Sequence, residues 1–72
     1  KKGLTYNEKI ELEKLPSEIE ILEVEKVQLT ERLNAGSTDH EVLTKLAIQI
    51  QELGDTIETK TARWVELSEM AG

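Results

Sequence analysis

The sequence predicts an all-α fold, an antiparallel two-helix coiled-coil hairpin with a short N-terminal helix kinked at Pro16. Two long stretches carry apolar residues at alternating spacings of three and four, which is the seam pattern of a coiled coil. A short glycine-containing segment, residues 34–37, separates them, and so short a connection makes the helices antiparallel. Residues 1–72 are therefore expected to form a single hairpin domain.

The composition limits the class of protein. The chain has 72 residues and no cysteine, so its core is small and no disulfide can reinforce it. It contains no apolar run near the ~20 residues of a membrane span and no hydrophobic segment after its first lysines. We expect a soluble, cytoplasmic chain without a membrane partner. The net charge of −6 opposes nonspecific attraction to nucleic acid.

The first helical segment is predicted over residues 6–14 and the second over 16–33. Thr5 and Glu8 have the spacing of a capping box, which marks a helix start. Pro16 has no amide hydrogen to donate to residue 12, and its ring crowds that carbonyl, which breaks or kinks a helix. Since proline is favoured at the first position of a helix, we expect a new helix to begin there, entered through a kink.

The third helix is predicted over residues 39–70. Gly36 supplies the left-handed backbone that commonly follows a helix end. Thr38 and Glu41 then repeat the capping-box spacing. Gly54 lies inside this helix, where glycine is ~1 kcal/mol less favourable for helix stability than alanine. The apolar pattern continues on both sides of it, so we expect the helix to continue through Gly54.

Two lysines stand at seam positions that should be apolar. The seam positions are Leu15, Ile19, Leu22, Lys26, Leu29 and Leu33 in the second helix, and Leu43, Leu46, Ile50, Leu53, Ile57, Lys60, Trp64 and Leu67 in the third. The stems of Lys26 and Lys60 are expected to pack while their ammonium groups point outward and help to fix the register. The alternative makes Lys60 part of an anion-binding surface.

The end of the hairpin beyond the proline needs its own apolar cluster. Trp64 and Leu67 continue the seam of the third helix past Pro16, so the first segment must cover them. Its apolar residues are Leu4, Tyr6, Ile10 and Leu12. We expect them to close around Trp64; the alternative is that Tyr6 and Trp64 stack on an unpaired nucleotide base.

Two stretches resemble the C-terminal domain of Uup-type ABC-F ATPases. They are GLTYNEKIELEKLPSEIEILE at residues 3–23 and RWVELSE at residues 63–69. That family has a Leu-Ser/Thr-Tyr start, an EL..LP..IE.LE run, a hairpin turn and a closing RW..LE segment. The paired signatures are more specific than the heptads, which fit the family as well.

The resemblance implies a larger parent protein, of which this chain is a C-terminal piece. The parent would be a cytoplasmic bacterial ATPase with two ATP-binding cassettes, which hold ATP and Mg²⁺. ABC-F proteins are linked to the ribosome, and the Uup-type terminal domain is associated with DNA binding. The chain itself has no GxxxxGK[ST] phosphate loop, so we expect no cofactor and no ATPase chemistry within it.

No catalytic or metal site is expected. The sequence suggests no nucleophile with a base and an orienting group. With one histidine and no cysteine, a zinc site is not expected either. His40, in the first turn of the third helix, is interpreted as an ordinary surface residue.

Charge divides the hairpin into a base end, residues 1–16 with 60–72, and a tip, residues 17–59. The base end has six cations against five carboxylates, a balance of +1, whereas the tip has three against ten, a balance of −7. A contact with DNA or ribosomal RNA is therefore expected at the base end, and to be weak. The candidate residues are Lys1, Lys2, Lys9, Lys14, Lys60 and Arg63.

A second candidate surface consists of aliphatic residues outside the seams. At about 100° per residue, Ile21, Val24 and Val27 lie opposite the stripe of the second helix, and Ile48 lies opposite that of the third. Scattered exposed aliphatics are common. The functional alternative is a spacer or interaction coiled coil that docks on the parent's cassettes or a second copy. In isolation we expect a monomer; a dimer formed by opening the hairpin is the other possibility.

Overall fold

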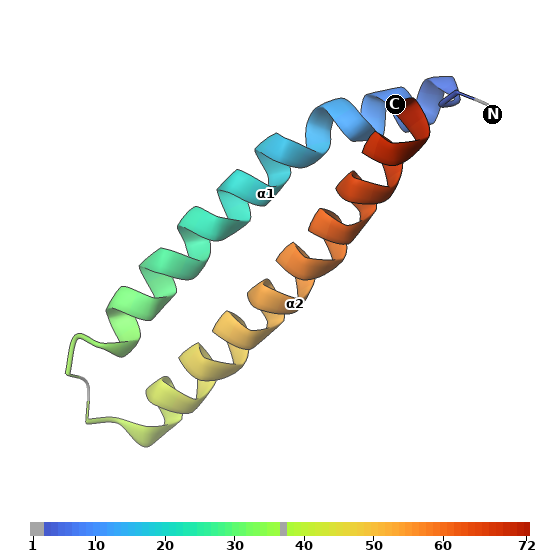
Figure 1. The fold of residues 1–72 in the computed structure, drawn as a ribbon. Helices are drawn as coiled ribbons and strands as arrows, with labels where there is room; N and C mark the ends of the chain where they lie inside the picture. Colours follow the sequence, from blue (N-terminus) through green and yellow to red (C-terminus); the bar gives the residue numbers. More distant parts are fainter. Residues whose placement is uncertain (1–2, 37) are drawn as a thin grey trace.

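The computed structural model describes residues 3–36 and 38–72, which form two long antiparallel helices, α1 (Tyr6–Leu33) and α2 (His40–Ala71). The helices lie side by side and are joined by a short turn, with both chain ends at the opposite end of the rod (Figure 1). The molecule extends 55 × 16 × 15 Å. This arrangement confirms the predicted all-α hairpin.

A complete capping box begins α1. The Glu8 amide donates to the Thr5 hydroxyl at 3.2 Å, and the Thr5 amide donates to the Glu8 carboxylate at 2.9 Å. Two amides that the first turn leaves without helical partners are thereby satisfied. The start predicted from these residues is confirmed.

Pro16 lies inside α1, and the predicted break between residues 14 and 16 is wrong. The helix runs through the proline without interruption, and its N-terminal part turns away from the line of the remainder (Figure 1). A bend relieves the clash of the ring with the preceding turn, and only one helical hydrogen bond is lost. The predicted kink is present, but it joins two parts of one helix.

The turn and the start of α2 follow the sequence with one correction. Gly36 has φ +88°, in the left-handed region predicted for it. Asp39, and not Thr38, caps α2: its carboxylate accepts from the Glu41 amide at 2.9 Å. Aspartate is as good a cap as threonine or better, so the residue nearer the helix takes the role.

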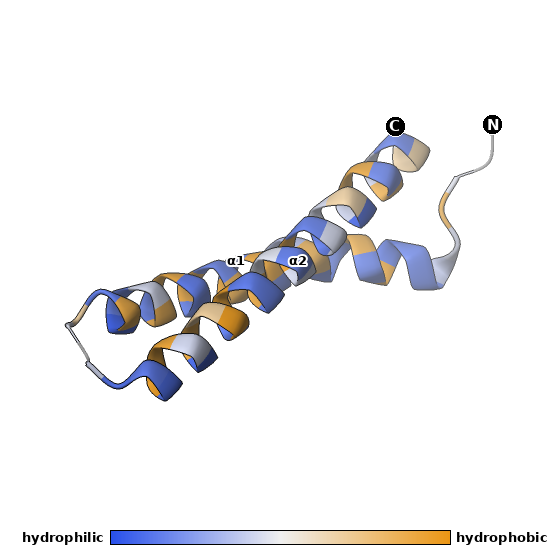
Figure 2. Ribbon diagram, turned by 90° about the horizontal axis from the view of Figure 1, so that it is seen from below, coloured by the Kyte–Doolittle hydropathy of each residue, from blue (hydrophilic) through white to orange (hydrophobic). Residues whose placement is uncertain are grey.

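Only three residues of the described chain are buried, and all three are seam leucines. They are Leu15, Leu46 and Leu67. The other apolar seam residues are partly buried, and Trp64 is exposed. Burial is incomplete because two helices alone can cover no more than one stripe of each other. Figure 2 shows how short hydrophobic stretches alternate with hydrophilic ones along both helices.

The apolar cluster at the base end is centred on Leu67 rather than Trp64. Leu67 is completely buried, whereas the side chains of Trp64 and Tyr6 are 39% and 77% exposed. The expectation that both aromatic rings pack inside this cluster is therefore wrong for Tyr6 and only half right for Trp64. The first turn of α1 points its tyrosine away from the seam.

Lys26 reaches across the seam toward α2. Its Nζ lies 3.6 Å from the position that a Cβ on Gly54 would occupy, so the stem crosses where the neighbouring helix has no side chain. The residue as a whole is exposed, as expected for a lysine whose stem packs and whose ammonium stays hydrated.

Neither helix, within the described residues, combines the length and the apolar character that a membrane crossing needs.

Truncation of Leu67 should cause the largest loss of stability in the base end. Leu67→Ala is expected to lower the free energy of unfolding by ~2–5 kcal/mol, because it removes fully buried methyl groups and leaves a cavity. Val65→Ala, at an exposed position of the same helix, should change it by ~0.5 kcal/mol or less. Urea unfolding followed by circular dichroism measures both; equal losses would contradict the assigned core.

Alanine at residue 54 should stabilise the hairpin. A Cβ there meets only the Lys26 ammonium at ordinary contact distance, so Gly54→Ala gains helix propensity of ~1 kcal/mol without a clash. The same unfolding experiment measures the gain. A loss of stability would mean that the helices approach more closely at Gly54 than the structure shows.

Candidate nucleic-acid interface at the base end

The cations of the base end fall into two groups. Lys9 and Lys14 are exposed on α1, while Lys60 and Arg63 are partly buried on the side of α2 that faces α1. The remaining candidates, Lys1 and Lys2, lie outside the described residues.

Arg63 is bound by carboxylates from both helices. Its Nε and Nη2 donate to the two carboxylate oxygens of Glu11 on α1, at 2.9 and 3.2 Å. Its Nη1 donates to Glu66, one turn further along α2. A bidentate guanidinium–carboxylate contact fixes the relative orientation of the two groups as well as their separation. It connects the segment before Pro16 to the end of α2.

Lys60 makes the equivalent contact on the other side of the proline. Its Nζ lies 3.0 Å from the Glu18 carboxylate. The ammonium is therefore directed at an acid of the same hairpin instead of pointing outward as expected. Together the two contacts attach α1 to α2 on both sides of Pro16.

The Arg63 contacts shift the pKa values of the two partners in opposite directions, each toward the charged form. The hydrogen bonds that Arg63 donates to Glu11 and to Glu66, in that order of importance, raise the pKa of Arg63. The hydrogen bond from Arg63, with the positive charges of Arg63 and Lys60, lowers the pKa of Glu11 from its ordinary 4.5, against a smaller opposing effect of desolvation. Both residues are thus held in their charged forms near neutral pH.

The exposed lysines flank an exposed aromatic ring. At about 100° per residue, Lys9 and Lys14 stand on opposite sides of Tyr6 within one arc of about 140°, facing away from the buried Leu15. Glu13 falls inside the same arc and offsets part of their charge. We define Tyr6, Lys9 and Lys14 as the lysine–tyrosine face.

Sequence reasoning missed two features of this region. Glu11 and Glu18 entered the sequence analysis only as charges in a sum. Both flank the apolar seam, and residues at such positions of a coiled coil form salt bridges with the partner helix. Tyr6 was assigned to packing because Trp64 and Leu67 needed partners and Tyr6 is one of the apolar residues of the first segment. Its phase, nearly opposite Leu15, was the signal that places it outside.

The candidate docking residues are exposed, as the helical phase predicted. Ile21, Val24, Val27 and Ile48 all lie more than half in solvent.

Neutralising Glu11 should reveal a pH-dependent contribution to stability. Because its pKa is lowered in the folded chain, Glu11 stabilises the fold above its ordinary pKa of 4.5, and this contribution is lost as pH falls through the lowered value. Glu11→Gln should therefore be less stable than the unmodified chain near neutral pH, with the difference closing in acid. Urea unfolding across that range measures it. Glu20→Gln, at an exposed carboxylate of the same helix, is the control; the same profile for both variants would contradict the contact.

Comparison with known proteins identifies the type of domain. No curated protein and no solved structure matches the chain. A model of the family described as the ABC transporter C-terminal domain matches residues 3–69, which is nearly all of the chain. This match confirms the resemblance to a C-terminal domain of an ABC protein. The chain belongs to the ABC transporter C-terminal domain family.

Proposed function

We propose that this domain is a non-catalytic accessory part of a cytoplasmic, bacterial ABC-F ATPase of the Uup type, and that its base end contacts nucleic acid. The family match supports an accessory domain of an ABC protein. The ATP, the Mg²⁺ and the hydrolysis belong to the parent's cassettes, since the 72 residues contain no phosphate-binding loop. DNA or ribosomal RNA is the ligand.

The observation that carries the proposal is the lysine–tyrosine face. Lys9 and Lys14 are exposed and, among the residues that the structure describes, have no ion-pair partner. Tyr6 lies between them with its ring in solvent. Two cations beside an exposed ring suit a single strand, in which phosphates pair with lysine and an unstacked base packs on the aromatic.

The ion pairs show which described cations of the base end are already engaged. Arg63 contacts Glu11 and Glu66, and Lys60 contacts Glu18, so these two cations are used within the hairpin. We therefore assign Arg63 and Lys60 to holding the base end together, and the phosphate contacts to Lys9 and Lys14 with Lys1 and Lys2. The tip, at −7, is repelled from the strand.

Binding should be weak, dependent on salt and sensitive to charge at this face. With two to four phosphate contacts, the affinity for a labelled single-stranded oligonucleotide should fall roughly 7- to 50-fold between about 50 and 200 mM salt. Lys9→Gln and Lys14→Gln should each weaken binding, whereas Glu13→Gln, which removes the acid from the same arc, should strengthen it. Fluorescence anisotropy with the 72-residue chain measures each affinity.

The matched control is Lys45→Gln, an exposed lysine of the tip, which should leave the affinity unchanged. Tyr6→Leu should weaken binding to the single strand more than binding to a duplex, because a base in a duplex is already stacked. Binding that ignores salt, or an equal response to Lys9→Gln and Lys45→Gln, would contradict the proposal.

A second candidate function is docking on another protein through the outer side of α1. The observation that favours it is the run of exposed aliphatic side chains at Ile21, Val24 and Val27, in the part of the hairpin that repels phosphate. The two proposed functions use different stretches of α1 and are compatible.

A further inference from the structure

Three aliphatic side chains form a continuous apolar ridge on the outer side of α1. Ile21, Val24 and Val27 are 60%, 51% and 57% exposed. They follow one another at intervals of three, so they form one of the side-chain rows by which helices pack into each other's grooves. The row spans about 9 Å along the axis, since each residue rises ~1.5 Å. Single exposed aliphatics are ordinary, but a strip of three has the form of a packing surface.

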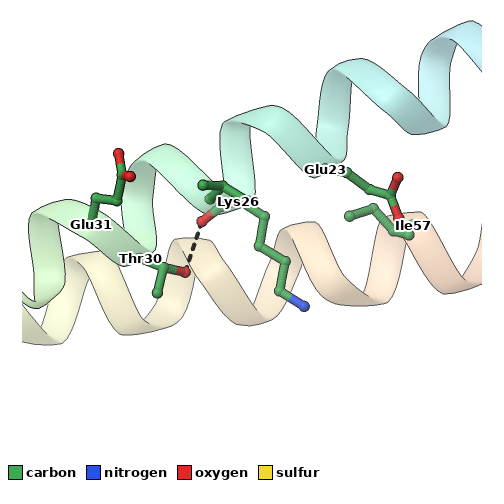
Figure 3. Close-up of a pocket in the computed structure, with 6 residues that line it drawn as sticks. Glu23, Lys26, Thr30, Glu31 and Ile57 are labelled. Atoms are coloured by element: carbon green, nitrogen blue, oxygen red, sulfur yellow. Dashed lines mark hydrogen bonds between the residues drawn. The ribbon is translucent and has the colours of Figure 1, made fainter.

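A groove between the helices extends this ridge sideways. Val27 also lines a surface depression of about 410 Å³, together with Ile57 from α2. Figure 3 shows the Lys26 stem stretching from α1 across α2 in this groove, and Glu31 pointing away from α2. The Thr30 hydroxyl donates to the Lys26 carbonyl at 2.8 Å, so that proton is already used within the helix. The groove thus presents aliphatic surface, with Glu23 and Glu31 among its lining residues.

The net charge around the ridge is negative, although Lys26 places one cation in the groove. Glu20, Glu23 and Glu31 are exposed beside it, and no ion pair to any of them occurs in the described part of the chain. The tip as a whole carries −7. A second copy of this hairpin would bring the same negative surface, and like charges brought together at an interface oppose association. A partner that complements this surface has an apolar stripe flanked by basic residues.

We propose that the ridge and its groove bind a basic amphipathic helix of a partner protein. Apolar residues of that helix, at intervals of three and four, pack against Ile21, Val24 and Val27, as in other helix-in-groove recognition. Lysines or arginines flanking its apolar side reach the exposed carboxylates, and one long aliphatic stem fits the groove beside Val27. This inference rests on the docking function proposed above and names the chemistry of its partner.

Four designed helical peptides test the proposal by titration of the isotope-labelled hairpin. Three share the same apolar stripe and carry lysine, glutamine or glutamate on the polar side; the fourth is the lysine peptide with its sequence scrambled. The lysine amphipathic peptide should bind at least ~10-fold more tightly than each of the others. It should shift the amide resonances of residues 20–31 more than those of residues 60–70.

Two substitutions on the hairpin separate packing from charge. Val24→Ser removes apolar surface without changing charge or greatly changing helix propensity, and should weaken the lysine peptide roughly 5- to 10-fold. Val65→Ser, at an exposed valine of the base end, is the matched control and should have no effect. Glu20→Gln combined with Glu31→Gln should weaken binding and reduce its dependence on salt.

The outcomes distinguish a wrong partner from a wrong function. If the scrambled lysine peptide binds as tightly as the amphipathic one, the attraction is bulk charge alone and the proposal is overturned. If the glutamine or glutamate peptide binds best at the ridge, docking stands and the basic partner is wrong. If no amphipathic peptide perturbs residues 20–31, the docking function fails together with this inference.

Discussion

The contact between Arg63 and Glu11 determines how the base end of the hairpin is built. A planar guanidinium that meets both oxygens of one carboxylate fixes the direction of approach as well as the separation. Arg63 holds the segment before Pro16, and Lys60 holds Glu18 just after it. Partly exposed ion pairs add little stability individually. Here they join both parts of the bent α1 to α2, at the end of the hairpin where Leu67 is completely buried.

The same contacts separate the surfaces to which the two proposed functions are assigned. Cations on α2 are used inside the hairpin, whereas the exposed Lys9 and Lys14 on α1 stand on either side of Tyr6. The acidic tip carries the apolar ridge, which suits a basic partner and not a phosphate backbone. The two proposed functions thus fall on different stretches of α1. Along the helix axis, Ile21 lies about 10 Å beyond Lys14, since each residue rises ~1.5 Å.

The sequence predicted the features that depend on local periodicity. It did not predict the features that depend on contacts between residues far apart in the chain. The seams, the turn at Gly36 and the capping box at Thr5 are local patterns, and the structure confirms them. Whether Pro16 breaks or bends a helix depends on the residues that lie across the seam, which local rules for proline do not contain. The partners of Arg63 can be assigned only after the register of the two helices is known. Tyr6 was misplaced because every apolar residue of the first segment was assigned to cover Trp64 and Leu67, whereas Tyr6 is 77% exposed.

A double-mutant cycle on Glu11 and Arg63 tests the central claim most directly. The free energy of unfolding would be measured for the unmodified chain, Glu11→Gln, Arg63→Gln and the double variant, at low and at high salt. If the contact orients the base end, the two single losses together exceed the loss in the double variant, and this coupling shrinks as salt rises. Strictly additive losses at both salt concentrations would show that the two side chains do not act on each other, and would contradict the account.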